Sequence, residues 1–229
     1  MIISHSHRFI FIKSAKTAGT SLESALSHHC GGDDIVTPLG DYGVNRDEDG
    51  NWVHKSMNAG DFKQHDHGLT IRNRVTPEVW NDYFKFSIAR NPWDRVLSLF
   101  FWKHRNDPEL RPRKRLYHRL GIPFDEMGPA RKLFSQFVAR GDWETNDRFY
   151  IIGDELCVDF VIRYENLEEG FGEVCDRIGV PVPSLPKLKT GIRAKGHHYS
   201  EYYDEHARRI VADRHGNDVR LLGYEFEKA

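Results

Sequence analysis

The sequence predicts an α/β fold with a mainly parallel central sheet flanked by helices. Three apolar runs, Arg8–Lys13, Phe84–Ala89 and Cys157–Ile162, are each followed by a helical pattern. Nearly continuous apolar runs are typical of parallel strands that are covered on both faces. Strands that alternate with helices indicate an open α/β sheet, which binds its ligands at the carboxyl ends of its strands. A chain of 229 residues is expected to form one domain, residues 1–229.

Composition excludes several classes of protein. Charged residues make up 29% and apolar residues 39% of the chain, which is typical of a globular protein rather than a disordered one. The net charge of −1 gives no basic field for nucleic acid. Three widely spaced cysteines predict neither a disulfide framework nor a zinc site. Without an apolar run of about 20 residues or a leader pattern, we expect a cytoplasmic protein without a membrane span.

The helices are predicted from their boundaries and from their apolar stripes. A first helix starts near Thr20, with Glu23 at capping-box spacing, and ends at Cys30-Gly31. Thr76-Pro77 is a second helix start. Apolar residues at helical spacing predict further helices, which begin at Asn91 or cover 130–140, 167–178 and 201–214.

The run from Phe11 to Ser21, FIKSAKTAGTS, is a strand that leads through a short loop of small residues into a helix. Such a junction presents backbone N–H groups and the positive end of a helix dipole to an anion. A Walker A loop has its lysine directly after the last glycine, whereas here Lys16 precedes Gly19 by three residues. G-x-G-x-x-G is absent as well. The loop therefore predicts a phosphate-binding site that is not of the common nucleotide-hydrolase type.

A second motif follows the strand 84–89 and reads RNPWDRVLS from Arg90 to Ser98. Arg90 falls at the carboxyl end of that strand, where α/β sheets place their ligands. Ser98 lies about two helical turns further on, off the apolar stripe. An arginine and a serine that converge on one phosphate would form a charge-assisted site.

Together these two segments resemble the sulfotransferases that use 3′-phosphoadenosine 5′-phosphosulfate (PAPS), above all their carbohydrate-type branch with the heparan 2-O-sulfotransferases and many bacterial members. The resemblance implies a three-layer, P-loop-like fold. It also implies that the loop binds the 5′-phosphosulfate and that Arg90 and Ser98 bind the 3′-phosphate. The loop residues concerned are Lys16, Thr17, Ala18, Gly19, Thr20 and Ser21.

Further segments agree with the same family. Arg163-Tyr-Glu-Asn-Leu167 is similar to its R-Y-E-x-L segment, and the tail 202–224 is similar to its closing segment. The resemblance implies a nucleotide contact for Arg163. A basic loop that closes over the nucleotide would contain Arg193, Lys195 and Gly196.

The candidate general base is one of two histidines, His65 and His67, in the segment His65-Asp66-His67. Members of the family often carry a histidine here, and the 2-O-sulfotransferases carry an H-x-H pair. An imidazole with a pKa near neutral suits the removal of a proton from a hydroxyl. His65 lies six residues before Ile71-Arg72, which resembles a bacterial pattern and favours His65. The alternative is that both histidines lie in a solvated loop without a catalytic role. A metal site is not predicted, because no third ligand has suitable spacing.

The predicted function is transfer of a sulfuryl group from PAPS to the hydroxyl of a small molecule or a carbohydrate. Two alternatives stay open: a nucleotide or small-molecule kinase with a non-Walker phosphate loop, and a non-catalytic nucleotide-binding module. The segments 31–68 and 103–148 are expected on the acceptor side. The basic stretch 103–119 is a solvated helical face or a surface for an acidic acceptor. The sequence predicts neither the acceptor nor the oligomeric state.

Overall fold

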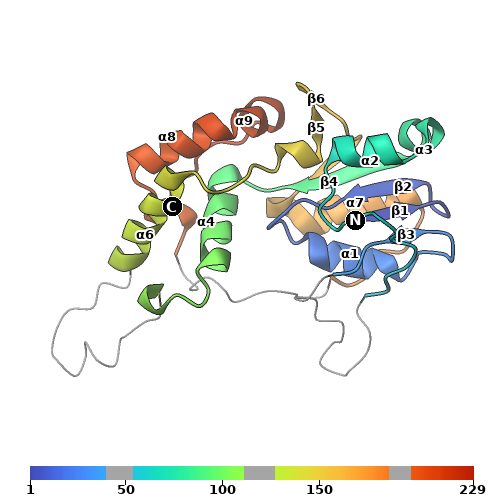
Figure 1. Cartoon of the computed structure of the whole chain (residues 1–229), viewed down its shortest axis with the longest axis horizontal. Coiled ribbons are helices and arrows are strands. Elements are labelled where there is room, and N and C mark those ends of the chain that lie inside the picture. The colour runs from blue at the N-terminus through green and yellow to red at the C-terminus, as the bar shows by residue number, and fades with distance from the viewer. Residues whose placement is uncertain (40–53, 111–126, 186–196) are drawn as a thin grey trace. The chain divides into compact units, whose positions relative to one another are not determined.

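The computed structural model of the chain describes residues 1–39, 54–110, 127–185 and 197–229 (Figure 1). The chain divides into two compact units. The first consists of Met1–Arg90 and Asn146–Thr190, and the second of Asn91–Thr145 and Gly191–Ala229. The expectation of a single domain stays a prediction.

The first unit contains a five-stranded sheet in the order β3-β1-β2-β4-β7. Its strands are β1 (Ile2–Ser4), β2 (Phe9–Ile12), β3 (Ile35–Val36), β4 (Phe84–Ala89) and β7 (Phe160–Arg163). β2 pairs with β4 and β4 with β7 in parallel, while β1 runs antiparallel to both of its neighbours. Four of the five strands therefore point the same way, which confirms a mixed α/β fold with a mostly parallel sheet.

Helices cover both faces of this sheet (Figure 1). On one face lie α1 (Gly19–Ser27) and α7 (Leu167–Ile178), which pack in one apolar cluster with alternate residues of the strands, among them Phe9, Phe11, Phe86, Ile88 and Ile162. On the other side lie α2 (Gly68–Arg74) and α3 (Pro77–Asp82). Since apolar residues point to both faces, the strands read as continuous apolar runs.

Short elements complete the first unit. The 3₁₀ turns η3 (Asp147–Phe149) and η4 (Tyr164–Asn166) flank the hairpin of β5 (Ile151–Ile152) and β6 (Glu155–Leu156) and strand β7. The second unit is helical among its described residues. It contains α4 (Pro92–Lys103), η2 (Pro108–Leu110), α6 (Gly128–Arg140), η5 (Tyr199–Tyr202), α8 (Glu205–Arg214) and α9 (Gly216–Leu222) around a separate apolar cluster.

Several predicted boundaries differ from the structure. The first helix ends at Ser27 rather than at Cys30-Gly31, and β7 begins three residues later than predicted. The helix expected from Glu201 begins at Glu205, because the carboxylate of Asp204 accepts from Ala207 N and caps it there. The predicted capping box of Thr20 and Glu23 is wrong: Ala18 is the N-cap residue, without a side-chain bond, and Glu23 is buried against Lys13.

No helix in the described part of the chain is both long and apolar enough to cross a membrane.

Candidate active site

The loop between β2 and α1 carries two residues in the left-handed backbone region, Lys16 with φ 66° and Ala18 with φ 62°. Neither is a glycine, so this conformation is unfavourable for both and persists only where surrounding contacts hold it. Left-handed residues between helical ones turn successive N–H groups toward one point, which is a common way to bind an anion. The backbone strain thus lies at the segment that the sequence predicts as the phosphate site.

Side chains from three segments brace this loop. The hydroxyl of Ser14 lies 2.7 Å from that of Thr17 and donates to the carbonyl of Ile88 on β4. Asn146 Nδ2 donates to the Ala15 carbonyl at 2.7 Å. Because the Thr17 side chain is fully buried, this residue has only its backbone to offer a ligand. Lys16, Ala18 and Thr20 are partly exposed, whereas Gly19 and Ser21 are buried.

Helix α1 begins directly after the left-handed Ala18, and this N-cap residue makes no side-chain cap bond. The nine residues of α1 are aligned peptide dipoles whose positive end meets the loop. An anion at this helix end would supply the acceptor that a capping side chain usually provides.

Arg90 connects the second motif to the loop. Its Nη1 donates to the carbonyl of Lys16 at 3.0 Å, and its guanidinium lies 4.1 Å from the ring centroid of Tyr164. The three segments that follow the parallel strands β2, β4 and β7 therefore meet at Arg90. The structure thus brings Arg90 and the loop together, at the edge where open α/β sheets bind ligands.

His65 is held against the start of the same loop. Its Nδ1 lies 3.0 Å from the carbonyl oxygen of Lys13, and its ring meets Phe149 edge-on. A carbonyl oxygen only accepts, so Nδ1 carries the proton and Nε2 has a lone pair. Desolvation is the largest cause that lowers the pKa of His65 to about 4, and the Lys13 ammonium adds to it, while the hydrogen bond opposes both. The residue as a whole is nevertheless exposed to solvent.

His67 lies differently. It is the N-cap residue of α2 without a side-chain cap bond, is partly buried, and meets the ring of Phe149 at 5.2 Å between centroids. Both histidines therefore contact the same phenylalanine, and of the two His65 is bonded to the residue that opens the loop.

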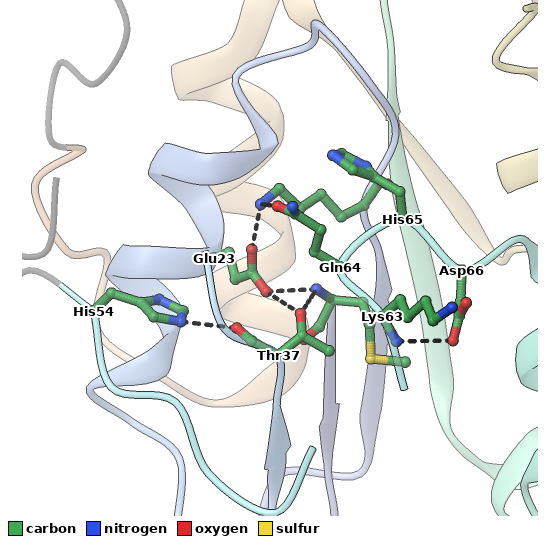
Figure 2. Close-up of polar contacts among 9 residues, drawn as sticks. Glu23, Thr37, His54, Lys63, Gln64, His65 and Asp66 are labelled. Atoms are coloured by element: carbon green, nitrogen blue, oxygen red, sulfur yellow. Dashed lines mark hydrogen bonds and ion pairs between the residues drawn. The ribbon is translucent and has the colours of Figure 1, made fainter. Parts of the chain in front are cut away.

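Beneath the loop lies a buried polar network (Figure 2). Lys13 Nζ is 2.5 Å from Glu23 Oε2 and 3.2 Å from Gln64 Oε1. Glu23 Oε1 accepts from the Thr37 hydroxyl at 2.7 Å and from the backbone nitrogen of Met1 at 2.5 Å. Burial acts to raise the pKa of Glu23, but the ammonium groups around it outweigh burial and lower that pKa.

The other predicted site residues lie elsewhere. Arg163 is exposed at the end of β7. Ser98 is partly buried on α4, in the second unit. Arg193, Lys195 and Gly196 lie outside the described residues, as does most of the basic stretch 103–119. Their roles stay predictions. Among the residues that the structure describes, no group of three or more His, Cys, Asp and Glu side chains is placed to hold a metal ion.

Four residues at the site were not predicted from the sequence: Lys13, Gln64, Asn146 and Tyr164. Lys13 carried a signal, because a lysine that extends an apolar strand needs a buried partner. Glu23 is that partner, although its spacing suggested a cap. Asn146 lies 131 residues from its partner Ala15, and no local pattern reports a contact at such a distance.

Comparison with known proteins identifies a relative and a family. A protein of Archaeoglobus fulgidus, named only as an uncharacterized protein, is 30% identical over 111 residues, which cover 48% of this chain and 80% of that protein. No solved structure matches the chain. The sequence pattern of the Sulfotransferase family matches residues 1–225, and the chain therefore belongs to the Sulfotransferase family.

Proposed function

We propose that this protein transfers a sulfuryl group from PAPS to a hydroxyl of a small molecule or carbohydrate. The observation that carries the proposal is the meeting of Arg90 with the strained loop at Lys16, beside the N-terminus of α1. PAPS has a phosphosulfate at one end of its ribose and a separate phosphate at the 3′ position. Two anion-binding motifs close to each other suit such a nucleotide better than a single phosphate-binding loop would.

In the proposed reaction an acceptor oxygen attacks the sulfur, and the bond between sulfur and the bridging oxygen of the 5′-phosphate breaks. The leaving group is 3′-phosphoadenosine 5′-phosphate (PAP), which takes the bonding electrons. Lys16 neutralises the charge that develops on the bridging oxygen, and the donors of residues 17–21 orient the transferred group. Arg90, Ser98 and Arg163, with Arg193, Lys195 and Gly196 of the basic loop, are the candidate contacts of the 3′-phosphate and the nucleotide.

His65 is the proposed general base. Because Nδ1 donates to the Lys13 carbonyl, Nε2 is the nitrogen that takes the proton of the acceptor hydroxyl. The lowered pKa of His65 keeps the ring neutral at physiological pH, so that the Nε2 lone pair is available, although an imidazole with a pKa near neutral is the stronger base. His67 is the alternative base. Substitution of each histidine in turn distinguishes the two roles.

The test is transfer of labelled sulfate from PAPS to a panel of hydroxyl acceptors, together with calorimetry of PAP binding. We expect PAP to bind, and Arg90→Ala to weaken PAP far more than adenosine 5′-phosphate, which lacks the 3′-phosphate. Failure to bind PAP would overturn the proposal. Binding without transfer to any acceptor, unchanged by Lys16→Ala, would indicate a non-catalytic binding module instead.

A further inference from the structure

Lys13 and Glu23 form an ion pair in the interior of the first unit. Their side chains are 1% and 0% exposed, and Nζ and Oε2 are 2.5 Å apart. Removing two charges from water costs several kcal/mol for each ion, and apolar replacements of such pairs are often neutral or stabilising. The stability of the fold is therefore a weak reason for a lysine at the end of an apolar strand.

The contacts of Lys13 indicate another reason, because this residue joins the loop to the candidate base. Its ammonium donates to Gln64 Oε1 at 3.2 Å, and its carbonyl accepts from His65 Nδ1 at 3.0 Å. Side chain and backbone thus hold two consecutive residues, 64 and 65. The position of His65 depends on where Lys13 lies.

Lys13 in turn lies where Glu23 and Gly19 place it. A Cβ at Gly19 would be 2.9 Å from Lys13 Cγ, so the lysine stem lies directly against the first residue of α1. Glu23, one turn further along α1, holds the ammonium end, and Thr37 Oγ1 holds its second oxygen at 2.7 Å. One extended side chain therefore contacts both the start of the helix and the segment that carries His65.

We propose that Lys13 and Glu23 are positioning residues, which hold His65 at a fixed place relative to the loop 14–21. The inference rests on the proposed function, since it assigns a role toward the base of that reaction. Neither side chain is accessible to a substrate, so both act through His65. In-line transfer needs the base, the acceptor oxygen and the sulfur in one geometry, and a displacement of about 1 Å costs a reaction on the order of 100-fold in rate.

The charges of these residues also act on the pKa of His65, which can be measured. Apart from desolvation, the charged groups that act on His65 are the Lys13 ammonium and the Met1 amino group, which lower its pKa, and the Glu23 carboxylate, which raises it. Loss of the lysine charge should therefore shift the titration of His65 upward. Loss of the glutamate charge should shift it downward. An ion pair that lies far from His65 would move neither.

The chain offers a matched control in the same sheet. Lys85 on β4 is also a strand lysine with a mostly buried side chain, and its Nζ lies 3.0 Å from Asp159 Oδ2. Its register partner on β2 is Ile10, three residues before Lys13. No contact joins Lys85 to His65 among the described residues. Lys85→Met thus removes a comparable ion pair at another place.

The experiment is an NMR titration of the His65 ring in labelled protein without ligand, with the resonance identified by its loss in His65→Gln. We expect a higher midpoint in Lys13→Met, a lower one in Glu23→Gln and no change in Lys85→Met. Lys13→Met leaves Glu23 buried with one cationic partner among the described residues, the Met1 amino group. The variant is therefore paired with Lys13→Met/Glu23→Met, which removes both side-chain charges; the buried Met1 amino group, whose pKa desolvation lowers to about 6, can then lose its proton. An unchanged His65 midpoint in both Lys13→Met and Glu23→Gln would overturn the inference.

Turnover supplies the second measurement. The folded double variant should lose about 10- to 100-fold in kcat with little change in the KM for PAPS, and Glu23→Gln, which can still accept from Lys13, should lose less. Wild-type kcat in the double variant would overturn the positioning role. If the protein failed to bind PAP, the proposed function would fall, whereas the shifts of the His65 midpoint would still report the link between these residues.

Discussion

Two histidines of this protein, one in each unit, show how differently an imidazole can be held. His215 has its Nδ1 2.6 Å from Asp218 Oδ2, and both side chains are almost completely buried. Its Nε2 is buried without a hydrogen-bond partner among the described residues, and its ring stacks on Trp143. His65 donates to a backbone carbonyl instead and keeps part of its surface exposed.

The comparison separates orientation from access. A carboxylate beside Nδ1 is the arrangement that orients the base of many hydrolases, and by that criterion His215 would be the stronger candidate. A buried ring does not reach a substrate, however, and its second nitrogen faces protein atoms. His65 combines a fixed proton on Nδ1 with an exposed surface beside the loop. It is therefore the better candidate base, although its partner is a backbone carbonyl and that of His215 is a carboxylate.

The largest expected effect is on turnover in His65→Gln. The glutamine amide can still donate to the Lys13 carbonyl, while the basic nitrogen is lost. We expect kcat to fall by about 10²- to 10⁴-fold at an unchanged melting temperature. The assay is sulfate transfer from PAPS, with His67→Gln as the matched control. If His67→Gln were the variant that lost activity, the base would be His67.

Lys16→Ala should cost about 10²- to 10³-fold in kcat, the usual loss when one group that stabilises developing charge is removed. Folding should be little affected, because the Lys16 side chain lies at a partly exposed loop position. The exposed Lys55 provides the control, since Lys55→Ala removes the same charge outside the loop. Loss of the melting transition in Lys16→Ala would contradict this role.

The opposite result is expected for the buried histidine. Asp218→Ala leaves Nδ1 of His215 without its acceptor, and an unsatisfied buried polar group costs about 1–3 kcal/mol in the free energy of unfolding. Urea denaturation measures this loss. Asp218→Asn, which keeps an oxygen acceptor, should lose less. Transfer per folded molecule should stay at the wild-type value, and a fall in kcat as large as that of His65→Gln would make His215 the catalytic histidine.

The sequence predicts the sheet and the loop well because these depend on local patterns. The strand at residues 84–89 and the helix at 167–178 have the predicted bounds, since apolar period, proline and glycine act over a few residues. β1 and β3 were not predicted, because strands of three and two residues give too short a period to recognise.

The site was predicted only in part for a similar reason. Lys16, Arg90 and His65 stand in motifs, whereas Lys13, Gln64, Asn146 and Tyr164 gain their roles from contacts between distant segments. Glu23 shows the limit most clearly. Its spacing from Thr20 fits a capping box, but the lysine at the end of β2 offers its carboxylate a stronger, charged partner.

A smaller effect is expected from Ala18→Gly, which tests whether the loop is strained. At φ 62° alanine is disfavoured and glycine is not. We expect the free energy of unfolding in urea to rise by about 0.5–1 kcal/mol. The greater conformational entropy that glycine gives the unfolded chain reduces this gain. Ala212→Gly within α8 should lose about 1 kcal/mol. A loss in both variants would show that Ala18 is not strained.

The smallest effect is expected from pH between 7 and 5. With a pKa of about 4, lowered chiefly by desolvation, His65 is still about nine-tenths neutral at pH 5, whereas a histidine at 6.5 would be about 3% neutral. Because protonation disables a base, kcat should fall only as pH drops toward 4.

Stability changes with pH in the same direction: the contribution of His65 to the free energy of unfolding is present above pH 6.5 and is lost as pH falls through 4. A profile of kcat against pH, with melting curves as control, decides between these values. A fall in kcat centred near 6.5 in the folded enzyme would indicate an unshifted histidine as the base.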